Sequence, residues 1–120
     1  MNETIKKQWI EALRSGNYTQ GTGALHKRSS DGLDTFCCLG VLCVLAVDAA
    51  AIRAPVGVVV DRMLYGDDEH GGYLPKAVRE WAGIGSEDGS LRNGDNLATH
   101  NDNGATFMEI ADIIEQQELI

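Results

Sequence analysis

The sequence predicts an α+β fold in one domain, residues 1–120, with about four helices packed on a small antiparallel sheet or hairpin. Three observations predict it: amphipathic helical patterns towards both ends, an apolar run in the middle, and short β-type segments beside turn residues. A chain of 120 residues is long enough for one domain with its own core and too short for two ordinary ones.

The first predicted helix covers residues 3–15. Ile5, Trp9 and Leu13 fall on one helical face, and Gly16 follows as a stop signal. The central run, residues 39–51, is apolar nearly all round and is therefore expected to form a buried helix.

Two further helices are predicted in the second half of the chain. A short one begins at Pro75, where the missing N–H costs nothing, and ends at Gly83. The last one begins after Thr106, which forms a capping-box pattern with Glu109 and precedes apolar residues at helical spacing.

The predicted strands are short. Residues 20–27 and 33–37 flank the turn signal at 29–32, and the β-branched residues 56–63 favour one more strand. The remaining polar, glycine-containing segments are predicted loops: residues 66–72 and 85–96.

The apolar residues predict a core and no membrane span. The longest apolar stretch, residues 36–47, is about a dozen residues long, whereas a span needs roughly twenty. The N-terminus shows no apolar signal region, so we expect a cytoplasmic protein without a membrane partner. Cys37, Cys38 and Cys43 lie within the apolar run, which predicts reduced, buried thiols rather than disulfides or metal ligands.

The formal charge of −8 is unevenly distributed along the chain. Residues 1–30 hold five basic and two acidic side chains, a net of +3, while residues 31–120 have a net of −11. A protein that tracks duplex nucleic acid needs a broad basic face, so that class of partner is disfavoured. A small anionic ligand needs only a few local donors, which we expect within the first thirty residues.

The first candidate site is the glycine-rich segment that follows the first helix. Its glycines allow backbone amides to approach an anion, Arg28 can bind a phosphate through two hydrogen bonds, and Tyr18 can stack on a base. The pattern is not a Walker loop, and the alternative is a helix exit followed by a solvated basic turn. The candidate residues are Arg14, Tyr18, Gln20, Gly21, Thr22, Gly23, His26, Lys27 and Arg28.

The second candidate site is the Asn-rich stretch that precedes the last helix. Asn101 and Asn103 can read a base or a ribose, and Thr106 stands where exposed helix amides attract anions. The alternative is ordinary turn and cap chemistry. The stretch does not fit a calcium-binding loop, since Thr99 and Ile110 would occupy the first and last ligand positions.

No arrangement in the sequence indicates a cofactor, a metal or a catalytic residue. His26, His70 and His100 lie far apart in the chain and form no local metal motif. One catalytic alternative stays open, in which His26 and His100 meet in space and cleave a phosphodiester by acid–base chemistry.

Four sequence blocks together resemble a widespread family of small tailed-phage and prophage proteins. The resemblance covers most of the chain except residues 44–72, and it implies no catalytic residues. The blocks are Trp9 to Tyr18 with Gln20 and Gly21, Phe36 to Cys43, Tyr73 to Pro75 with Glu80 to Gly83, and Leu97 and Ala98 with Asn101 to Phe107.

The resemblance implies a host-takeover or anti-defence protein in the host cytoplasm. We therefore expect a binding protein that sequesters a small anionic nucleotide-type immune signal, such as a cyclic oligonucleotide or an ADP-ribose derivative, without cleaving it. Trp9 and Trp81 on helix faces are compatible with a homo-oligomer. The alternatives are an inhibitor that occludes a basic host protein through its acidic surface and a small His-dependent phosphodiesterase.

Overall fold

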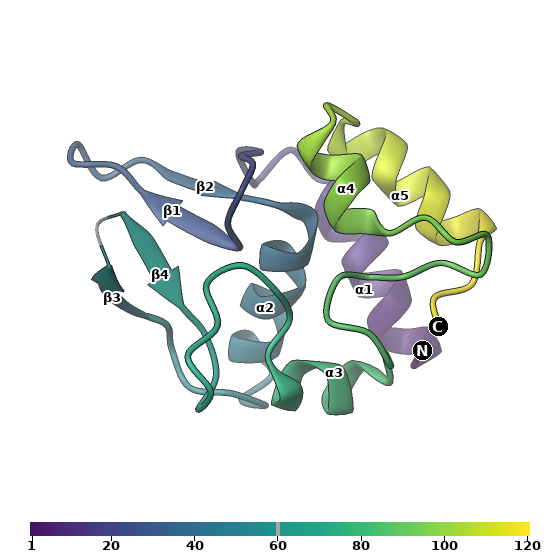
Figure 1. Ribbon diagram of the computed structural model, residues 1–120, viewed down its shortest axis with the longest axis horizontal. Coiled ribbons are helices and arrows are strands. Elements are labelled where there is room, and N and C mark those ends of the chain that lie inside the picture. The colour runs from purple at the N-terminus through teal and green to yellow at the C-terminus, as the bar shows by residue number, and fades with distance from the viewer. Residues whose placement is uncertain (60) are drawn as a thin grey trace.

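A central helix, α2, lies between a small sheet and a group of helices in the computed structural model, which describes residues 1–59 and 61–120 (Figure 1). This arrangement confirms the predicted α+β class with helices on a small antiparallel sheet. The described helices are α1 (Glu3–Arg14), α2 (Cys38–Asp48), α3 (Lys76–Ala82), α4 (Leu97–Asp102) and α5 (Phe107–Gln116). The described strands are β1 (His26–Arg28), β2 (Asp34–Phe36), β3 (Val56–Val59) and β4 (Arg62–Leu64).

The core is built around α2, which contacts α1, α3, α4 and β2. Seven of its eleven residues are buried, as expected for a helix that is apolar nearly all round. At Gly40, α2 lies directly against the backbone of Leu25. A Cβ atom at this position would be only 1.7 Å from the Leu25 carbonyl oxygen, so a larger residue would not fit. Cys37, Cys38 and Cys43 are all buried, which confirms the predicted burial of the three thiols.

The helices at the two ends of the chain pack against each other. The Asn2 side chain caps α1, and Thr106 and Glu109 form the predicted capping box at α5. Trp9, from α1, is fully buried and donates a hydrogen bond from Nε1 to the Cys38 carbonyl oxygen at 2.9 Å. Trp9 is therefore a core residue, and Trp81 is partly buried against the same core.

The sheet consists of two antiparallel hairpins joined side by side in the order β2-β1-β4-β3. Within the first hairpin, His26 pairs with Phe36 and Arg28 with Asp34. The hairpins meet where Lys27 of β1 pairs with Arg62 of β4. This contact places two basic residues directly opposite each other.

Two strand predictions need correction. The strand expected over residues 20–27 is reduced to β1, because Gly23 has a left-handed φ of +78° that interrupts the extended chain. The single strand expected over residues 56–63 is a hairpin, with Val60 outside the described residues. The β-branched residues of that segment indicated extended backbone but did not indicate where the chain reverses.

Two helix predictions also need correction. Helix α2 ends at Asp48 instead of residue 51, because Ala50 adopts a left-handed φ of +58° that terminates it. Helix α4 was not predicted, because its six residues are too few to show a helical period. Asn101 therefore lies within α4 and does not lead directly into the last helix.

Among the described helices, none combines the length and the apolarity that crossing a bilayer requires.

Candidate functional site

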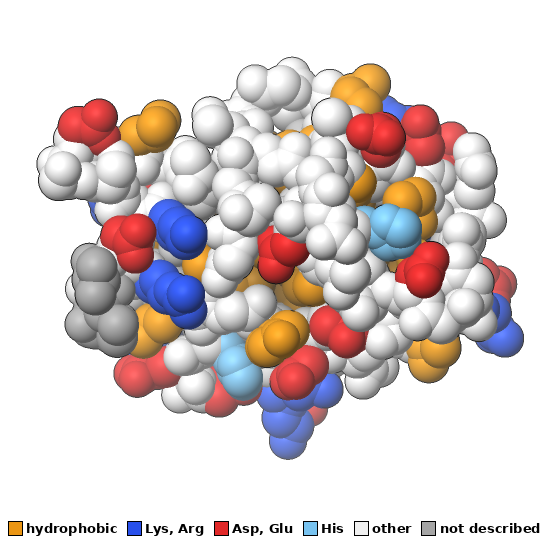
Figure 2. Space-filling model, turned by 45° about the horizontal axis from the view of Figure 1, so that its top comes forward, with side chains coloured by type: hydrophobic (Ala, Val, Ile, Leu, Met, Phe, Trp, Pro, Cys, Tyr) orange, Lys and Arg blue, Asp and Glu red, His pale blue; other side chains and the backbone are white. Residues whose placement is uncertain are grey.

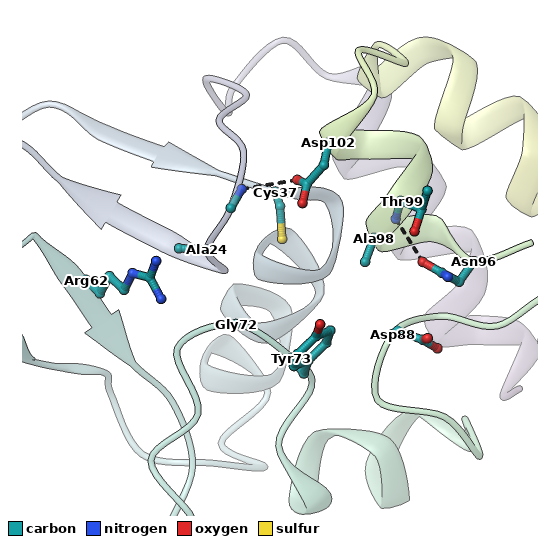
Figure 3. A pocket seen from close by; sticks show the side chains of 11 residues that line it. Ala24, Cys37, Arg62, Gly72, Tyr73, Asp88, Asn96, Ala98, Thr99 and Asp102 are labelled. Carbon is teal, nitrogen blue, oxygen red and sulfur yellow. Dashed lines mark hydrogen bonds between the residues drawn. The ribbon is translucent and has the colours of Figure 1, made fainter.

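A cleft of about 360 Å³ opens between the sheet and α4 (Figure 3). Arg62 of β4 borders it on one side, and α4 with the loop before it borders the other side. The loop that leads into β1 and the start of α2 complete the lining. The lining residues are Gly23, Ala24, Cys37, Arg62, Gly72, Tyr73, Asp88, Asn96, Ala98, Thr99 and Asp102.

The sheet side of the cleft is basic. The guanidinium of Arg62 points towards the cleft in Figure 3. Lys27 is its cross-strand partner, and the Lys27 ammonium would lie 3.8 Å from a Cβ atom at Gly23. Neither cation forms an ion pair with any residue that the structure describes. On the face shown in Figure 2, two basic side chains lie next to each other on the sheet side of the molecule, and acidic side chains are spread over the whole face.

The helix side of the cleft carries carboxylates that each use one oxygen within the protein. Asp102 Oδ1 accepts a hydrogen bond from the Gly23 amide at 3.1 Å, which ties the glycine-rich segment to α4. Asp88 Oδ1 accepts one from the Ser90 hydroxyl at 2.7 Å. The side chain of Tyr73, which is 48% exposed, stands between the two sides (Figure 3).

Cys37 supplies the only sulfur among the described lining residues, and Figure 3 shows it pointing towards the cleft. Burial raises the pKa of this thiol to about 11. The thiol is therefore protonated at neutral pH and is a weak nucleophile. No group of three or more His, Cys, Asp or Glu side chains in the described ranges could hold a metal ion.

The two candidate segments meet in space, but Gln20 and Asn101 use their amide groups inside the fold. Asn101 is buried, and its Oδ1 accepts from the Cys38 amide at 3.1 Å and from Gln20 Nε2 at 2.9 Å. Its Nδ2 donates to the Gly21 carbonyl oxygen at 2.9 Å. Gln20 also donates to the Ala105 carbonyl and accepts from the Phe107 amide. We call Gln20, Gly21, Cys38 and Asn101 the polar junction.

His26 is the first residue of β1, and it is buried, with 5% of its surface exposed. Its Nε2 lies 2.7 Å from Asp34 Oδ1, and its Nδ1 lies 2.7 Å from the Tyr65 hydroxyl. A carboxylate can only accept, so Nε2 donates to Asp34; in the neutral imidazole with this tautomer, Nδ1 is the acceptor for the Tyr65 hydroxyl. His100 instead lies 3.4 Å from Asp95, so the two histidines have different partners.

Most of the remaining basic and polar candidates also have partners. Arg14 pairs with Asp112 and Glu115 of α5 at 2.6 and 3.1 Å. Arg28 donates to Asp34 at 2.8 Å and borders a neighbouring cleft shared with Arg62.

The other candidates divide into packed, capping and exposed residues. The Tyr18 ring packs edge-on against the Phe36 ring, with 5.4 Å between the ring centroids. Thr106 caps α5, while Thr22 and Asn103 are exposed. Of the predicted site residues, Gly23 lines the cleft and Lys27 lies next to it.

Sequence reasoning missed Arg62, Tyr73 and Asp88. Arg62 is a single cation within a β-branched stretch, and nothing in the chain near it signals a site. Tyr73 belongs to one of the four blocks, which was the only available signal. The cleft is lined by residues from six separate segments of the chain, so only the tertiary structure brings them together.

A family model described as "Domain of unknown function (DUF8296)" matches residues 1–118, and the chain belongs to that family. No curated protein and no solved structure matches the chain.

Proposed function

We propose that this member of the DUF8296 family is a non-catalytic binding protein that holds a small anionic, nucleotide-type ligand in the cleft of Arg62 and Tyr73. The observation that carries the proposal is the Arg62 guanidinium, which borders the cleft without a carboxylate partner among the described residues. A guanidinium binds phosphate through charge-assisted hydrogen bonds, often two at once.

The other lining groups fit the remaining parts of a nucleotide. The exposed Tyr73 ring offers a stacking surface for a base. The carboxylates of Asp88 and Asp102 can accept hydrogen bonds from ribose hydroxyls or base amino groups. A volume of about 360 Å³ lies within the range of roughly 300–1,000 Å³ typical of small-molecule sites.

Two features favour binding without turnover. The cleft's described lining includes no histidine, and its Cys37 thiol is protonated at neutral pH because burial raises its pKa. His26, the residue that a phosphodiesterase would need, is buried between Asp34 and Tyr65. In the family context suggested by the four blocks, the biological role would be sequestration of a nucleotide-type immune signal that directs anti-phage defence in the host cytoplasm.

The proposal is tested by titrating the purified protein with nucleoside monophosphates, ADP-ribose derivatives and cyclic dinucleotides. We expect at least one of them to raise the melting temperature and to be recovered chemically intact after the protein is denatured. Recovery of a cleaved ligand would show an enzyme instead. If no ligand in the series shifts the melting temperature, the proposal is wrong.

The Arg62→Gln variant tests the location of the site. Loss of a charge-assisted hydrogen bond should weaken binding by roughly 10- to 100-fold. Arg53→Gln is the matched control. Arg53 is also an exposed arginine, but it lies away from the cleft, where its guanidinium is 3.9 Å from the carboxylates of Asp67 and Glu69. Arg28→Ala should have a smaller effect than Arg62→Gln, since Arg28 pairs with Asp34 and borders the neighbouring cleft. Equal losses in the Arg62 and Arg53 variants would place the site elsewhere.

A further inference from the structure

The two sides of the cleft carry opposite charges, and we infer that this fixes the class and the direction of the ligand. The ligand is a single nucleotide unit with its phosphate at Lys27 and Arg62. Its unphosphorylated ribose or base donors lie at Asp88 and Asp102. The inference rests on the proposed function and specifies which kind of nucleotide the cleft accepts.

The basic side of the cleft is arranged unfavourably unless an anion is present. Lys27 and Arg62 are direct cross-strand partners, so their side chains project from the same face of the sheet. Like charges directly opposite each other destabilise an antiparallel pair. A phosphate between them would remove this repulsion, and Gly23 would let it approach the backbone without a side chain in the way.

The acidic side of the cleft retains free hydrogen-bond acceptors. Asp88 and Asp102 each accept an internal hydrogen bond at Oδ1. Within the described part of the chain, neither Oδ2 atom has a hydrogen-bond donor. These oxygens can accept hydrogen bonds from a hydroxyl or an amino group, whereas a second phosphate would meet like charge.

The size of the cleft points to the same class. Its volume of about 360 Å³ is near the lower end of the range of roughly 300–1,000 Å³ for small-molecule sites. A cyclic dinucleotide has two phosphates on opposite sides of its ring. If one of them were bound at Arg62, the other would face Asp88 and Asp102.

The test compares two matched ligand series by isothermal titration calorimetry. The first series consists of the 5′-monophosphates of the four common ribonucleosides, and the second of the corresponding 3′,5′-bisphosphates. We expect the best-bound monophosphate to bind roughly 10-fold or more tightly than its own bisphosphate, because the added phosphate replaces a donor with an anion. Equal or tighter binding of the bisphosphate would overturn the inference and leave the proposed function standing.

Variants locate the source of this selectivity. Asp88→Asn and Asp102→Asn keep the oxygen that accepts the internal hydrogen bond but remove the charge, so the double variant should lose most of the preference for the monophosphate. Asp95→Asn is the control, because Asp95 is an exposed carboxylate of the same loop that does not line the cleft. An unchanged preference in the double variant would overturn the inference.

A further variant tests whether the basic side of the cleft binds the phosphate. Arg62→Gln should weaken binding of the monophosphate more than binding of the unphosphorylated nucleoside, which reduces the preference for the monophosphate. A variant that still prefers the monophosphate by the same factor would contradict the direction proposed here. If no nucleotide of either series binds the unmodified protein, the inference fails, and the proposed function then depends on the ADP-ribose derivatives and cyclic dinucleotides of the wider panel.

Discussion

A single buried side chain, that of Asn101, connects three of the four sequence blocks. The N-cap residue of α2, Cys37, forms no side-chain capping bond, and Asn101 Oδ1 accepts the hydrogen bond of the Cys38 amide instead. The same side chain holds Gln20 and the Gly21 carbonyl. The sequence singled out the segments of Gln20 and Asn101 as two separate candidate sites, and the two segments meet in the structure. Their amide groups, however, serve the fold, which the alternative of turn and cap chemistry anticipated better than ligand contact did.

The Asn101→Ala variant should be strongly destabilised. It would leave the Cys38 amide, the Gly21 carbonyl and one Gln20 donor without partners in the interior, and we expect a loss of about 2–4 kcal/mol in the free energy of unfolding. Urea denaturation measures it. Asn103→Ala is the control, since Asn103 is exposed, and should change stability by at most about 0.5 kcal/mol. Similar losses in both variants would contradict the structural role of Asn101.

Asp34 should make stability depend on pH in the acid range. Its hydrogen bond from Arg28, and then that from His26, lower the pKa of this carboxyl below its ordinary value of 3.8. A lowered pKa in the folded state stabilises the protein above pH 3.8, and this contribution is lost as the pH falls through the folded-state value. Asp34→Asn should therefore be less stable than the unmodified protein at pH 7, and the difference should shrink below that ordinary value. Chemical denaturation of both proteins at pH 7 and at a pH below 3.8 tests this. A difference in unfolding free energy that is larger at the acidic pH would contradict it.

At the scale of elements, the segments with a clear apolar period or clear boundary residues were predictable, including the short α3 between Pro75 and Gly83, whereas α4 and the β3–β4 reversal were not. Helices α1, α2 and α5 each contain ten or more residues, enough for apolar periodicity or a cap to be recognised. The six residues of α4 carry no such period, and the reversal between β3 and β4 left no clear turn pattern. Tertiary contacts therefore decide these short elements.

Gly40 shows why a glycine stands in the middle of α2. Helix interiors normally disfavour glycine, but here the helix approaches the Leu25 backbone so closely that no Cβ atom fits. Gly40→Ala should destabilise the protein by about 3 kcal/mol or more, because the obstacle is backbone and cannot rotate away.

Thermal or urea unfolding measures the effect of Gly40→Ala. Gly72→Ala is the control, since a Cβ atom there meets nothing within 4 Å and the backbone needs no left-handed conformation. If Gly40→Ala were as stable as the control, α2 would have to lie farther from Leu25 than the structure places it.

At the scale of the whole molecule, the excess of basic residues in the first thirty positions does not produce an equally basic surface. Arg14 and Arg28 of the basic N-terminal segment are paired with carboxylates from other elements. Lys27 faces Arg62, which comes from the acidic remainder of the chain. Net charge along the sequence therefore indicated that an anion site was possible, but it could not indicate which cations stay available, because pairing depends on the fold.

The three thiols should report on unfolding of the whole molecule. Burial raises the pKa of Cys37 to about 11 and raises the pKa values of Cys38 and Cys43 well above the usual range. At pH 7.5 we expect a thiol-specific chromogenic disulfide reagent to react at the slow rate of unfolding, and to modify all three cysteines at once in denaturant. Rapid modification of Cys38 or Cys43 in the native protein would contradict their burial.

The polar junction also separates what makes this protein recognisable from what makes it selective. The buried Asn101 and the partly buried Gln20 bond to each other, and Asn101 also bonds to the backbones of Gly21 and Cys38, so a change of either side chain disturbs the fold. Arg62 and Tyr73 are exposed, and replacing them leaves the interior untouched. Under the proposed function, changes of these surface side chains would therefore alter ligand preference without disturbing the polar junction.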